Sequence, residues 1–297
     1  PRKKDTHKGT YGHLLILAGS LGKTGAAIMA ARAALKSGAG LVTVATPRSC
    51  LPIIARSTME LMTEPLPETK EGTVSLEALP RLKELLKGKD CLLIGPGLSL
   101  HEETAELVKN LLPEINLPCL IDADGLNILA RFPELLKKLP KTCVLTPHPG
   151  EFSRLSGLST SDILSRRLEL AQNFSREYNI ILVLKGYRTI ISNPDGFIYI
   201  NPTGNPGMAS GGSGDVLSGL AASFLMQIKD SFLAVAAAVY IHGLSGDIAR
   251  ERVGERPLVA GDLIRFLPAA IKKLEDLARE KAAPGYGETG LIPLREI

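Results

Sequence analysis

The sequence predicts an α/β fold in which helices cover both faces of a mostly parallel central sheet and an antiparallel hairpin lies at one edge. Short apolar runs alternate with longer helical stretches along the chain, a pattern typical of parallel strands joined by helices. The turn-forming segment Asn193-Pro194-Asp195-Gly196 separates two late strand-like runs and predicts the hairpin. With 44% hydrophobic and 22% charged residues among 297, the chain has the composition of a folded domain with a large core.

Eight short apolar runs predict the strands of this sheet. They lie at 13–18, 41–45, 91–94, 118–121, 144–146, 180–184, 189–192 and 197–200. Thr46-Pro47 is expected to end the second strand, and Gly95-Pro96-Gly97 the third. Between these two strands, Pro65, Pro67 and Gly72 indicate loops.

Helices are expected between the strands and after the last one. The stretch 24–37 is rich in alanine without internal proline, which favours a helix, and 162–178 has an amphipathic pattern. Further helical stretches lie at 48–58, 76–87, 102–112, 214–227, 231–250 and 261–281. No linker interrupts 10–275, so we expect one domain over 1–281 and a peripheral tail at 282–297.

Charge, cysteine content and hydropathy indicate the expected partners and cellular compartment. The net charge of +4 comes from 35 basic and 31 acidic residues without a basic block, so nucleic acid is not an expected partner. The four cysteines form no CxxC pair, which favours a reduced, cytoplasmic protein without structural zinc. No run of 18 apolar residues and no signal-peptide core occur, so we expect no membrane contact. Starting at Pro1 and entering a strand by about Leu14, the chain is compatible with a domain cut from a longer protein.

Residues 203–219 combine five glycines, from Gly204 to Gly214, with an apolar helical run that begins at Val216. Closely spaced glycines allow left-handed conformations, and the amides at a helix start form an anion site. A flexible linker would be followed by polar residues, whereas here a hydrophobic helix follows. Asp215 stands at the helix start, where it either caps the helix or acts as a base that activates a hydroxyl group.

The two commonest nucleotide-binding motifs are absent. Gly22-Lys23-Thr24 suggests a P-loop, but that motif requires glycine at position 17, which is Leu17. The GxGxxG dinucleotide motif also fails, because Leu100 and Leu217 occupy its last glycine position. Phosphate binding at the glycine-rich segment therefore requires another geometry.

Polar or glycine residues follow most of the predicted parallel strands. These segments are Gly19-Ser20 with Gly25-Ala26, Gly95-Pro96-Gly97, Asp122-Ala123-Asp124, His148 to Glu151, and Lys185-Gly186. Ligands of open α/β sheets bind at the carboxyl ends of the strands. Any one segment is explained equally well as an ordinary loop, but five of them beside a glycine-rich anion site predict a ligand-binding edge.

Three residues at this edge each allow two interpretations. Lys185 ends an apolar strand, so its ammonium group either reaches solvent or binds a phosphate. His148 contacts a substrate or is a plain surface histidine, since no HxxxH or HxH spacing supports a metal site. Glu151 either caps the next helix or holds Mg²⁺ through water, because Mg²⁺ keeps several waters and takes few carboxylates.

Three further polar residues also have ordinary structural explanations. Asp122 and Asp124 are two residues apart, so within a strand they would share one face. Asp124 is as readily the N-cap of a following helix as a catalytic group. His242 lies inside an apolar helical stretch, which favours a packed core histidine.

Taken together, these segments resemble the NAD(P)H-hydrate dehydratase family, whose members have a three-layer ribokinase-like fold. The matching pieces follow the family's order from residue 7 to about residue 270: His7-Lys8-Gly9-Thr10-Tyr11-Gly12, Ala18-Gly19-Ser20, Gly25-Ala26-Ala27, Ile94-Gly95-Pro96-Gly97-Leu98, Asp122-Ala123-Asp124-Gly125-Leu126-Asn127, Leu145-Thr146-Pro147-His148-Pro149-Gly150-Glu151, Lys185-Gly186 and 204–215. The segment around His148 and the glycine-rich segment are the specific parts. Related sugar and vitamin kinases carry Asn near this position, so His148 favours the dehydratase branch.

The resemblance implies a repair enzyme, a carbon–oxygen lyase that uses ATP or ADP to remove water from the S form of hydrated NADH or NADPH (NADHX or NADPHX). It implies that Ala26, Gly97, His148 and Asp215 contact the hydrated nicotinamide nucleotide. It also implies that Lys185, Gly186, Tyr187, Arg188, Thr189 and Gly214 hold the adenine nucleotide. The family tends to form homotetramers and is often fused to an epimerase domain that interconverts the two hydrate forms.

The chemistry of this layout suggests a kinase-like step. Hydroxide is a poor leaving group, so phosphorylation of the ring hydroxyl makes elimination feasible. Our hypothesis is that Asp215 accepts the hydroxyl proton while the amides of Gly211, Gly212, Ser213 and Gly214 stabilise the transferred phosphoryl group. Mg²⁺, placed by Glu151, would bridge the phosphates.

Two alternatives remain open from the residues. A small-molecule kinase of the same fold that phosphorylates a vitamin precursor would share the glycine-rich segment and Asp215, but it would not explain His148. A non-catalytic nucleotide sensor would keep the anion site and would not need Asp215. The choice between ATP and ADP, and between NADHX and NADPHX, is also left open.

Overall fold

One nine-stranded sheet organises the chain. The computed structural model describes residue 2 and residues 4–282. In spatial order the strands are β3 (Met62–Leu66), β2 (Leu41–Pro47), β1 (His13–Leu17), β4 (Cys91–Ile94), β5 (Cys119–Ile121), β6 (Cys143–Leu145), β7 (Ile181–Leu184), β8 (Ile190–Ser192) and β9 (Ile198–Ile200). Strands β1 to β7 pair in parallel, whereas β8 and β9 pair antiparallel at one edge. The predicted parallel sheet and its edge hairpin are therefore confirmed.

Successive side chains of each strand pack on opposite faces of the sheet, because the period of a strand is two residues. In β1, Leu14 and Ile16 belong to one apolar cluster, and Leu15 and Leu17 belong to the other. Both faces are apolar, as expected for a parallel sheet that is covered on both sides.

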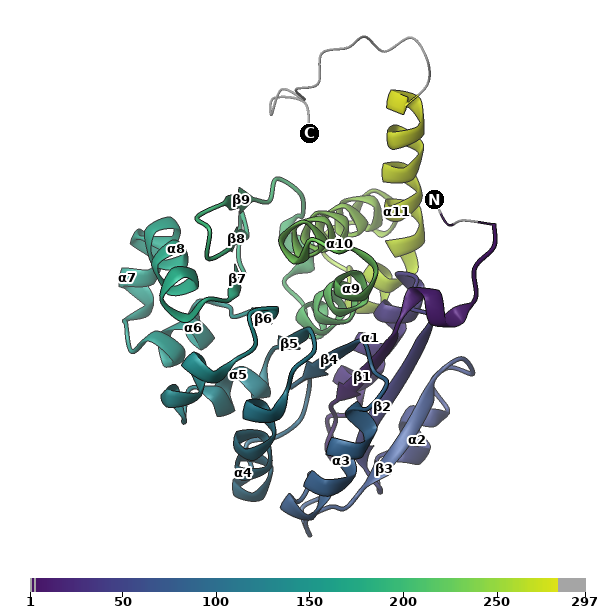
Figure 1. Ribbon diagram of the computed structural model, residues 1–297. Helices are drawn as coiled ribbons and strands as arrows, with labels where there is room; N and C mark the ends of the chain where they lie inside the picture. The colour runs from purple at the N-terminus through teal and green to yellow at the C-terminus, as the bar shows by residue number, and fades with distance from the viewer. Residues whose placement is uncertain (1, 3, 283–297) are drawn as a thin grey trace.

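A layer of helices covers each face (Figure 1). One layer contains α1 (Thr24–Lys36), α2 (Leu51–Ala55), α9 (Ser213–Gln227), α10 (Ser231–Val253) and α11 (Ala260–Ala282). The other contains α3 (Leu79–Leu86), α4 (Glu102–Leu111), α5 (Asp124–Leu129), α6 (Pro149–Ser156), α7 (Thr160–Ser165) and α8 (Arg167–Tyr178). Short 3-10 helices lie at Lys8–Tyr11, Leu76–Ala78, Leu112–Glu114, Pro133–Lys138 and Pro206–Met208. The tail expected from residue 282 lies, from 283 on, outside the described residues.

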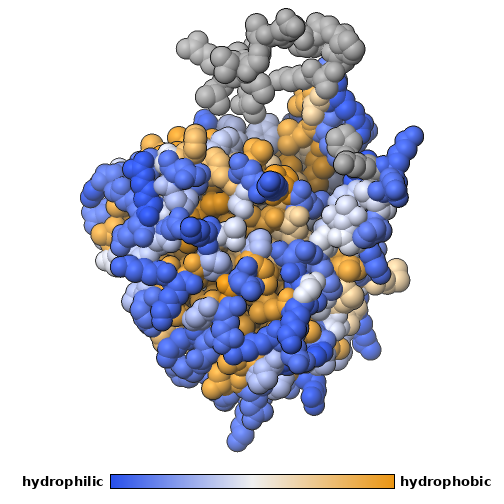
Figure 2. All heavy atoms as spheres, in the orientation of Figure 1, coloured by the Kyte–Doolittle hydropathy of each residue, from blue (hydrophilic) through white to orange (hydrophobic). Residues whose placement is uncertain are grey.

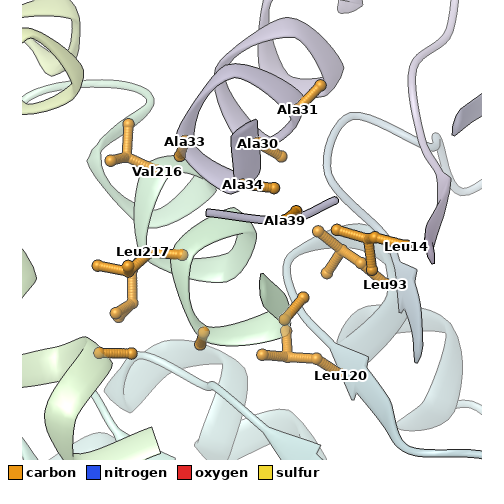
Figure 3. Packing of buried hydrophobic residues seen from close by; sticks show 14 of the residues in the cluster. Leu14, Ala30, Ala31, Ala33, Ala34, Ala39, Leu93, Leu120, Val216 and Leu217 are labelled. Atoms are coloured by element: carbon orange, nitrogen blue, oxygen red, sulfur yellow. The ribbon is translucent and has the colours of Figure 1, made fainter. Parts of the chain in front are cut away.

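Two small residues, Ala30 in α1 and Gly219 in α9, allow these helices to pack closely. A Cβ atom on Gly219 of α9 would lie 1.9 Å from the carbonyl oxygen of Ala30 in α1. The buried face of α1 is made of alanines, including Ala30, Ala33 and Ala34, and Figure 3 shows it beside Val216 and Leu217 of α9. The start of α9, which carries the glycine-rich segment, is thereby fixed against the first helix.

The second strand and its surroundings differ from the prediction. Thr46-Pro47, expected to end this strand, are its last two residues and pair with β3. The strand β3 itself was missed, because Pro65 indicated a loop. It is an edge strand with a single neighbour, β2, and proline is tolerated there because one side of an edge strand has no partner to bond. The helix expected at 48–58 is only the short α2.

The single amphipathic helix expected at 162–178 is two helices. Arg166 adopts φ −128° and ψ 32°, outside the helical region, and separates α7 from α8. The α7 helix starts earlier than expected, because the Ser159 side chain caps it by accepting the amide of Asp162. The break makes Arg167 the first residue of α8.

One described helix, α10, is long and apolar enough to cross a membrane by length and composition alone. Of its apolar window, 67% is buried inside the protein, where α10 packs against α9 and α11. That burial is the pattern of a core helix. On the face seen in Figure 2, hydrophilic residues are interspersed among the apolar ones.

We predict that Gly219→Ala lowers the free energy of unfolding by about 3 kcal/mol or more, because the added methyl group would push α9 away from α1. The measurement is chemical denaturation at neutral pH.

Gly261→Ala is the matched control. Gly261 lies in the first turn of α11, and nothing would lie within 4 Å of its added Cβ, so this change should be neutral or stabilise the fold by up to about 1 kcal/mol. Equal effects of the two substitutions would contradict the packing described here.

Candidate active site

The carboxyl ends of the parallel strands form one edge of the sheet, and the strand order reverses between β1 and β4. From β1 the chain proceeds to β2 and β3 on one side, and β4 to β7 follow on the other. Ligands of open α/β folds bind at such a switch point. The loops after β1 and β4 therefore flank the expected crevice.

Ala26 and Gly97 lie together at this switch point. Gly97 is in the left-handed region with φ +62°, and a Cβ atom there would lie 3.1 Å from the Cβ of Ala26 and 2.6 Å from the carbonyl oxygen of Lys23. The Ser20 hydroxyl donates to the carbonyl of Gly97 at 2.8 Å. A side chain at position 97 would fill the space between the two loops.

The two aspartates after β5 do not share a face, contrary to the expectation for a continuing strand. The strand ends at Ile121, and α5 begins at Asp124. Asp122 is buried, with 1% exposure. The side chain of Asp124 accepts the amide of Ser99 at 2.8 Å and pairs with Lys23 Nζ at 3.1 Å, so Asp124 is not the N-cap of α5.

Lys185 is turned inward rather than toward solvent. Its Nζ lies 2.7 Å from Asp122 Oδ1 and 3.8 Å from Glu151 Oε2, and its side chain is 18% exposed. Burial alone would lower the pKa of Lys185, but the carboxylates of Asp122 and Glu151 outweigh it and raise the pKa. The ammonium group therefore stays charged at the start of α9, where a Cβ on Gly214 would lie 3.5 Å from it.

Asp122 has a second partner that the sequence did not indicate. The hydroxyl of Ser218, one turn into α9, shares its one hydrogen between two acceptors, Asp122 Oδ2 and the carbonyl of Gly214. Ser218 is fully buried. Its spacing of three residues from Asp215 was the available signal, since residues three apart lie on one side of a helix.

Asp215, in the first turn of α9, has an unusual pKa. Burial, followed by the negative charge of Asp122, raises the pKa of this carboxyl from 3.8 to about 7, although Lys185 acts in the opposite direction. Asp124 and Glu151 add smaller upward contributions. A carboxylate that is half protonated near neutral pH has the proton affinity of a general base.

Residues 211–214, which we call the phosphate loop, lead into α9. Gly212 is the N-cap in the left-handed region with φ +91°, and a Cβ there would lie 2.2 Å from Met29 Sδ in α1. The first amides of a helix have no partner within the helix. The amide of Ser213 donates to the carbonyl of Ser210 at 3.3 Å, which leaves the neighbouring amides of this turn for an anion beside Lys185 and Asp215.

His242 is buried in α10, as predicted, but it also contacts the phosphate loop. Its Nε2 lies 3.0 Å from the carbonyl oxygen of Ser213. Burial lowers the pKa of His242 to about 4, so the ring is neutral and Nε2–H donates this bond. His242 of α10 thus holds the phosphate loop through the carbonyl of Ser213.

His148 is the N-cap of α6 and also presents its ring to solvent. Its Nδ1 accepts the amides of Gly150 at 3.0 Å and Glu151 at 3.3 Å, so the proton of the neutral ring is on Nε2. Burial, followed by Lys185 and Arg154, lowers the pKa of His148 and favours this neutral form. The side chain is 52% exposed, and its Nε2 lies 3.6 Å from Glu151 Oε1.

Glu151 completes the cap of α6. Its Oε2 accepts the amide of His148 at 2.8 Å, so the capping alternative is confirmed. Burial raises the pKa of Glu151. In the part of the chain that the structure describes, no three His, Cys, Asp or Glu side chains are grouped to hold a metal. The magnesium role of Glu151 stays a prediction.

Residues 185–189, which we call the nucleotide loop after the binding role predicted from the sequence, connect β7 to β8. Gly186 has φ +142° and Arg188 has φ +55°, and Tyr187 is 84% exposed. The hydroxyl of Thr189 donates to the carbonyl of Gly186 at 3.0 Å. This loop begins at Lys185 and so lies directly beside the phosphate loop.

We predict that Asp215→Asn raises the melting temperature at pH 8 by at least about 2 °C and changes it little at pH 4. With its pKa raised from 3.8 to about 7, the carboxyl holds a proton in the folded protein that the unfolded chain has released. Its contribution to stability is therefore present below pH 3.8 and is lost as the pH rises through about 7. Melting curves of both proteins across this range provide the test, and a difference independent of pH would contradict the shifted pKa.

Comparison with known proteins identifies the family of this chain. A family model described as NAD(P)H-hydrate dehydratase matches residues 14–268. The bifunctional NAD(P)H-hydrate repair enzyme of Moorella thermoacetica is 49% identical over 286 residues, which are 96% of this chain and 54% of that protein. The chain thus spans about half the length of that relative.

Solved structures show the same fold over nearly whole chains. The ADP/ATP-dependent NAD(P)H-hydrate dehydratase of Bacillus subtilis, co-crystallized with ATP/Mg²⁺, superposes with a TM-score of 0.79 and 32% identity over 92% of this chain and 93% of that one. A ribokinase-like superfamily protein of Enterococcus faecalis gives a TM-score of 0.81 and 30% identity over 92% and 91% of the two chains. The fold is therefore ribokinase-like, and the chain belongs to the NAD(P)H-hydrate dehydratase family.

Proposed function

We propose that residues 1–281 form one catalytic domain that dehydrates the S form of NADHX or NADPHX to NADH or NADPH, at the expense of ATP or ADP. The observation that carries this proposal is the Asp215 carboxyl, whose pKa burial raises to about 7 at the first turn of α9. A base of that strength beside an anion site is what phosphorylation of a hydroxyl group requires.

The reaction balances as two steps. First, Asp215 accepts the proton of the ring hydroxyl while the hydroxyl oxygen attacks the terminal phosphorus of the nucleotide. The nucleotide leaves one phosphate shorter. Second, the carbon–oxygen bond breaks, inorganic phosphate departs, and the neighbouring carbon loses a proton to restore the double bond. The protonated carboxyl of Asp215 returns its proton to solvent between turnovers.

Charge stabilisation comes from groups that are fixed before the substrates bind. The ammonium of Lys185, held 2.7 Å from Asp122, and the amides of the phosphate loop both face the transferred phosphoryl group in this proposal. Preorganised donors of this kind contribute to rate because they need no reorganisation during the reaction.

The hydrated nicotinamide nucleotide occupies the switch-point crevice in this proposal. Ala26 and Gly97 leave room for it, since a side chain on Gly97 would contact Ala26. His148, whose side chain is half exposed, contributes Nε2–H as a donor, and Asp215 faces the ring hydroxyl.

The adenine nucleotide lies along the nucleotide loop, Lys185 to Thr189, and against Gly214. Support comes from the Bacillus subtilis relative, which was crystallised with ATP/Mg²⁺. Mg²⁺ would be held chiefly by nucleotide phosphates and water, with Glu151 as a water-mediated partner, and would offset phosphate charge. One carboxylate suffices for such a site.

The cellular location, the partner enzyme and the oligomeric state are proposed from the same family likeness. We propose a cytoplasmic location, which suits four buried cysteines that are all free. Functional coupling to an epimerase is suggested by the bifunctional relative. The β9 edge carries the exposed apolar residues Phe197, Ile198 and Ile200, a surface that suits the proposed homotetramer.

The direct assay is to incubate NADHX or NADPHX with the protein, Mg²⁺ and either ATP or ADP. We expect recovery of the absorbance of the reduced nicotinamide together with one phosphate released per molecule repaired. Asp215→Asn should lower turnover by at least about 100-fold while nucleotide still binds. Binding of nucleotide by the wild-type protein without any repair would favour a sensor or a vitamin-precursor kinase instead, and full activity of the variant would exclude Asp215 as the base.

His148→Asn tests the substrate contact separately from the helix cap. Asparagine still caps a helix, so stability should change little, whereas loss of Nε2–H should raise the KM for the hydrate by about tenfold. Steady-state kinetics and melting temperatures measure the two effects.

His101→Asn is the matched control, since His101 also caps its helix by accepting an amide at Nδ1. It should leave the KM unchanged. An unchanged KM in His148→Asn would contradict the substrate role of His148.

A further inference from the structure

The guanidinium group of Arg167 donates hydrogen bonds to three carbonyl groups near the end of β7. Its Nη1 donates to the carbonyl of Tyr187 at 2.7 Å. Its Nη2 donates to the carbonyls of Leu184 at 3.2 Å and Arg188 at 3.4 Å. Arg167 is the first residue of α8, so a helix of one layer is tied to the loop between β7 and β8 (Figure 1).

Two of these carbonyls, those of Tyr187 and Arg188, lie in the nucleotide loop, and Leu184 is the last residue of β7 just before it. The ends of the loop are fixed by the sheet, because the amide of Lys185 donates to Pro147 and the carbonyl of Thr189 accepts the amide of Asn201. Between these ends, Arg188 adopts φ +55°, a left-handed conformation that costs a non-glycine residue roughly 1 kcal/mol. Contacts from outside the loop must therefore hold this shape.

Arginine suits this role because its planar guanidinium presents several donors in fixed directions, whereas lysine presents one compact charge. A Cβ on Gly186 would lie 3.3 Å from Arg167 Nη2, so the loop lies closely over the guanidinium. Within the described residues Arg167 has no carboxylate partner at ion-pair distance. Its neighbour Arg166 pairs instead with Glu169 at 2.6 Å.

We propose that Arg167 is a positioning residue that holds the nucleotide loop in its binding shape before the nucleotide arrives. The inference rests on the proposed function only because that function makes an adenine nucleotide the ligand. The hydrogen bonds of Arg167 to the loop do not depend on it. Arg167 acts through loop carbonyls and contacts no reacting atom. Since Asp122 holds Lys185 independently, loss of Arg167 weakens nucleotide binding more than it slows the chemical step.

The test compares Arg167→Lys with Arg166→Lys, two neighbouring changes that both keep the positive charge. For Arg167→Lys we expect the KM and the Kd for ATP or ADP to rise about tenfold. The kcat and the KM for the hydrate should stay within about twofold. Arg166→Lys should change none of these, and Arg167→Gln, which keeps only one donor group, should weaken nucleotide binding at least as much as Arg167→Lys.

Hydrogen exchange of the loop amides provides a readout that does not depend on activity. Without nucleotide, residues 186–189 should exchange faster in Arg167→Lys than in the wild-type protein, while Arg166→Lys matches the wild type. Unchanged exchange, or faster exchange with unchanged nucleotide affinity, would overturn the proposal. If the wild-type protein binds no nucleotide, the proposed function fails, and the exchange comparison still decides whether Arg167 holds the loop.

Discussion

The ion pair between Lys185 and Asp122 is the interaction on which the site depends. It joins the ends of β7 and β5 beneath the first turn of α9, with Nζ and Oδ1 2.7 Å apart. Removing one partner of a buried pair leaves an uncompensated charge, which is strongly destabilising. With both partners present, the ammonium stays charged beside Gly214. The buried carboxylate of Asp122, after the effect of burial itself, helps to raise the pKa of Asp215.

Packing between helices places the other half of the site. Because Gly219 has no side chain, α9 approaches the backbone of α1, and the phosphate loop is thereby set against Met29 and the loops at the switch point. His242 supports the same loop from α10. The reactive groups thus come from both helical layers and the sheet between them, so the site is complete only when the whole domain is folded.

The sequence predicted the fold well because periodicity and turn residues are local signals. The strand-end segments and the glycine-rich segment converge on one edge, as expected of parallel strands. Prediction failed where a distant partner decides the outcome. Pro65 is accepted in a strand because that strand is at the edge. Asp122 and Asp124 diverge because the strand ends at Ile121, before both of them, and distant lysines pair with each. For Ser218 the only sequence signal was its spacing from Asp215, and its bond to Asp122 is made by the fold. Arg167 had no sequence signal, since its bonds reach carbonyl groups brought near by the fold.

The central claim is that the ring hydroxyl is phosphorylated before it leaves. The most direct measurement uses NADHX that carries oxygen-18 in this hydroxyl group, incubated with the protein, Mg²⁺ and ATP, followed by mass analysis of the inorganic phosphate. Our account predicts that the phosphate released contains the labelled oxygen, one atom for each molecule of NADH restored. Recovery of NADH with unlabelled phosphate, and with the label in water, would contradict it.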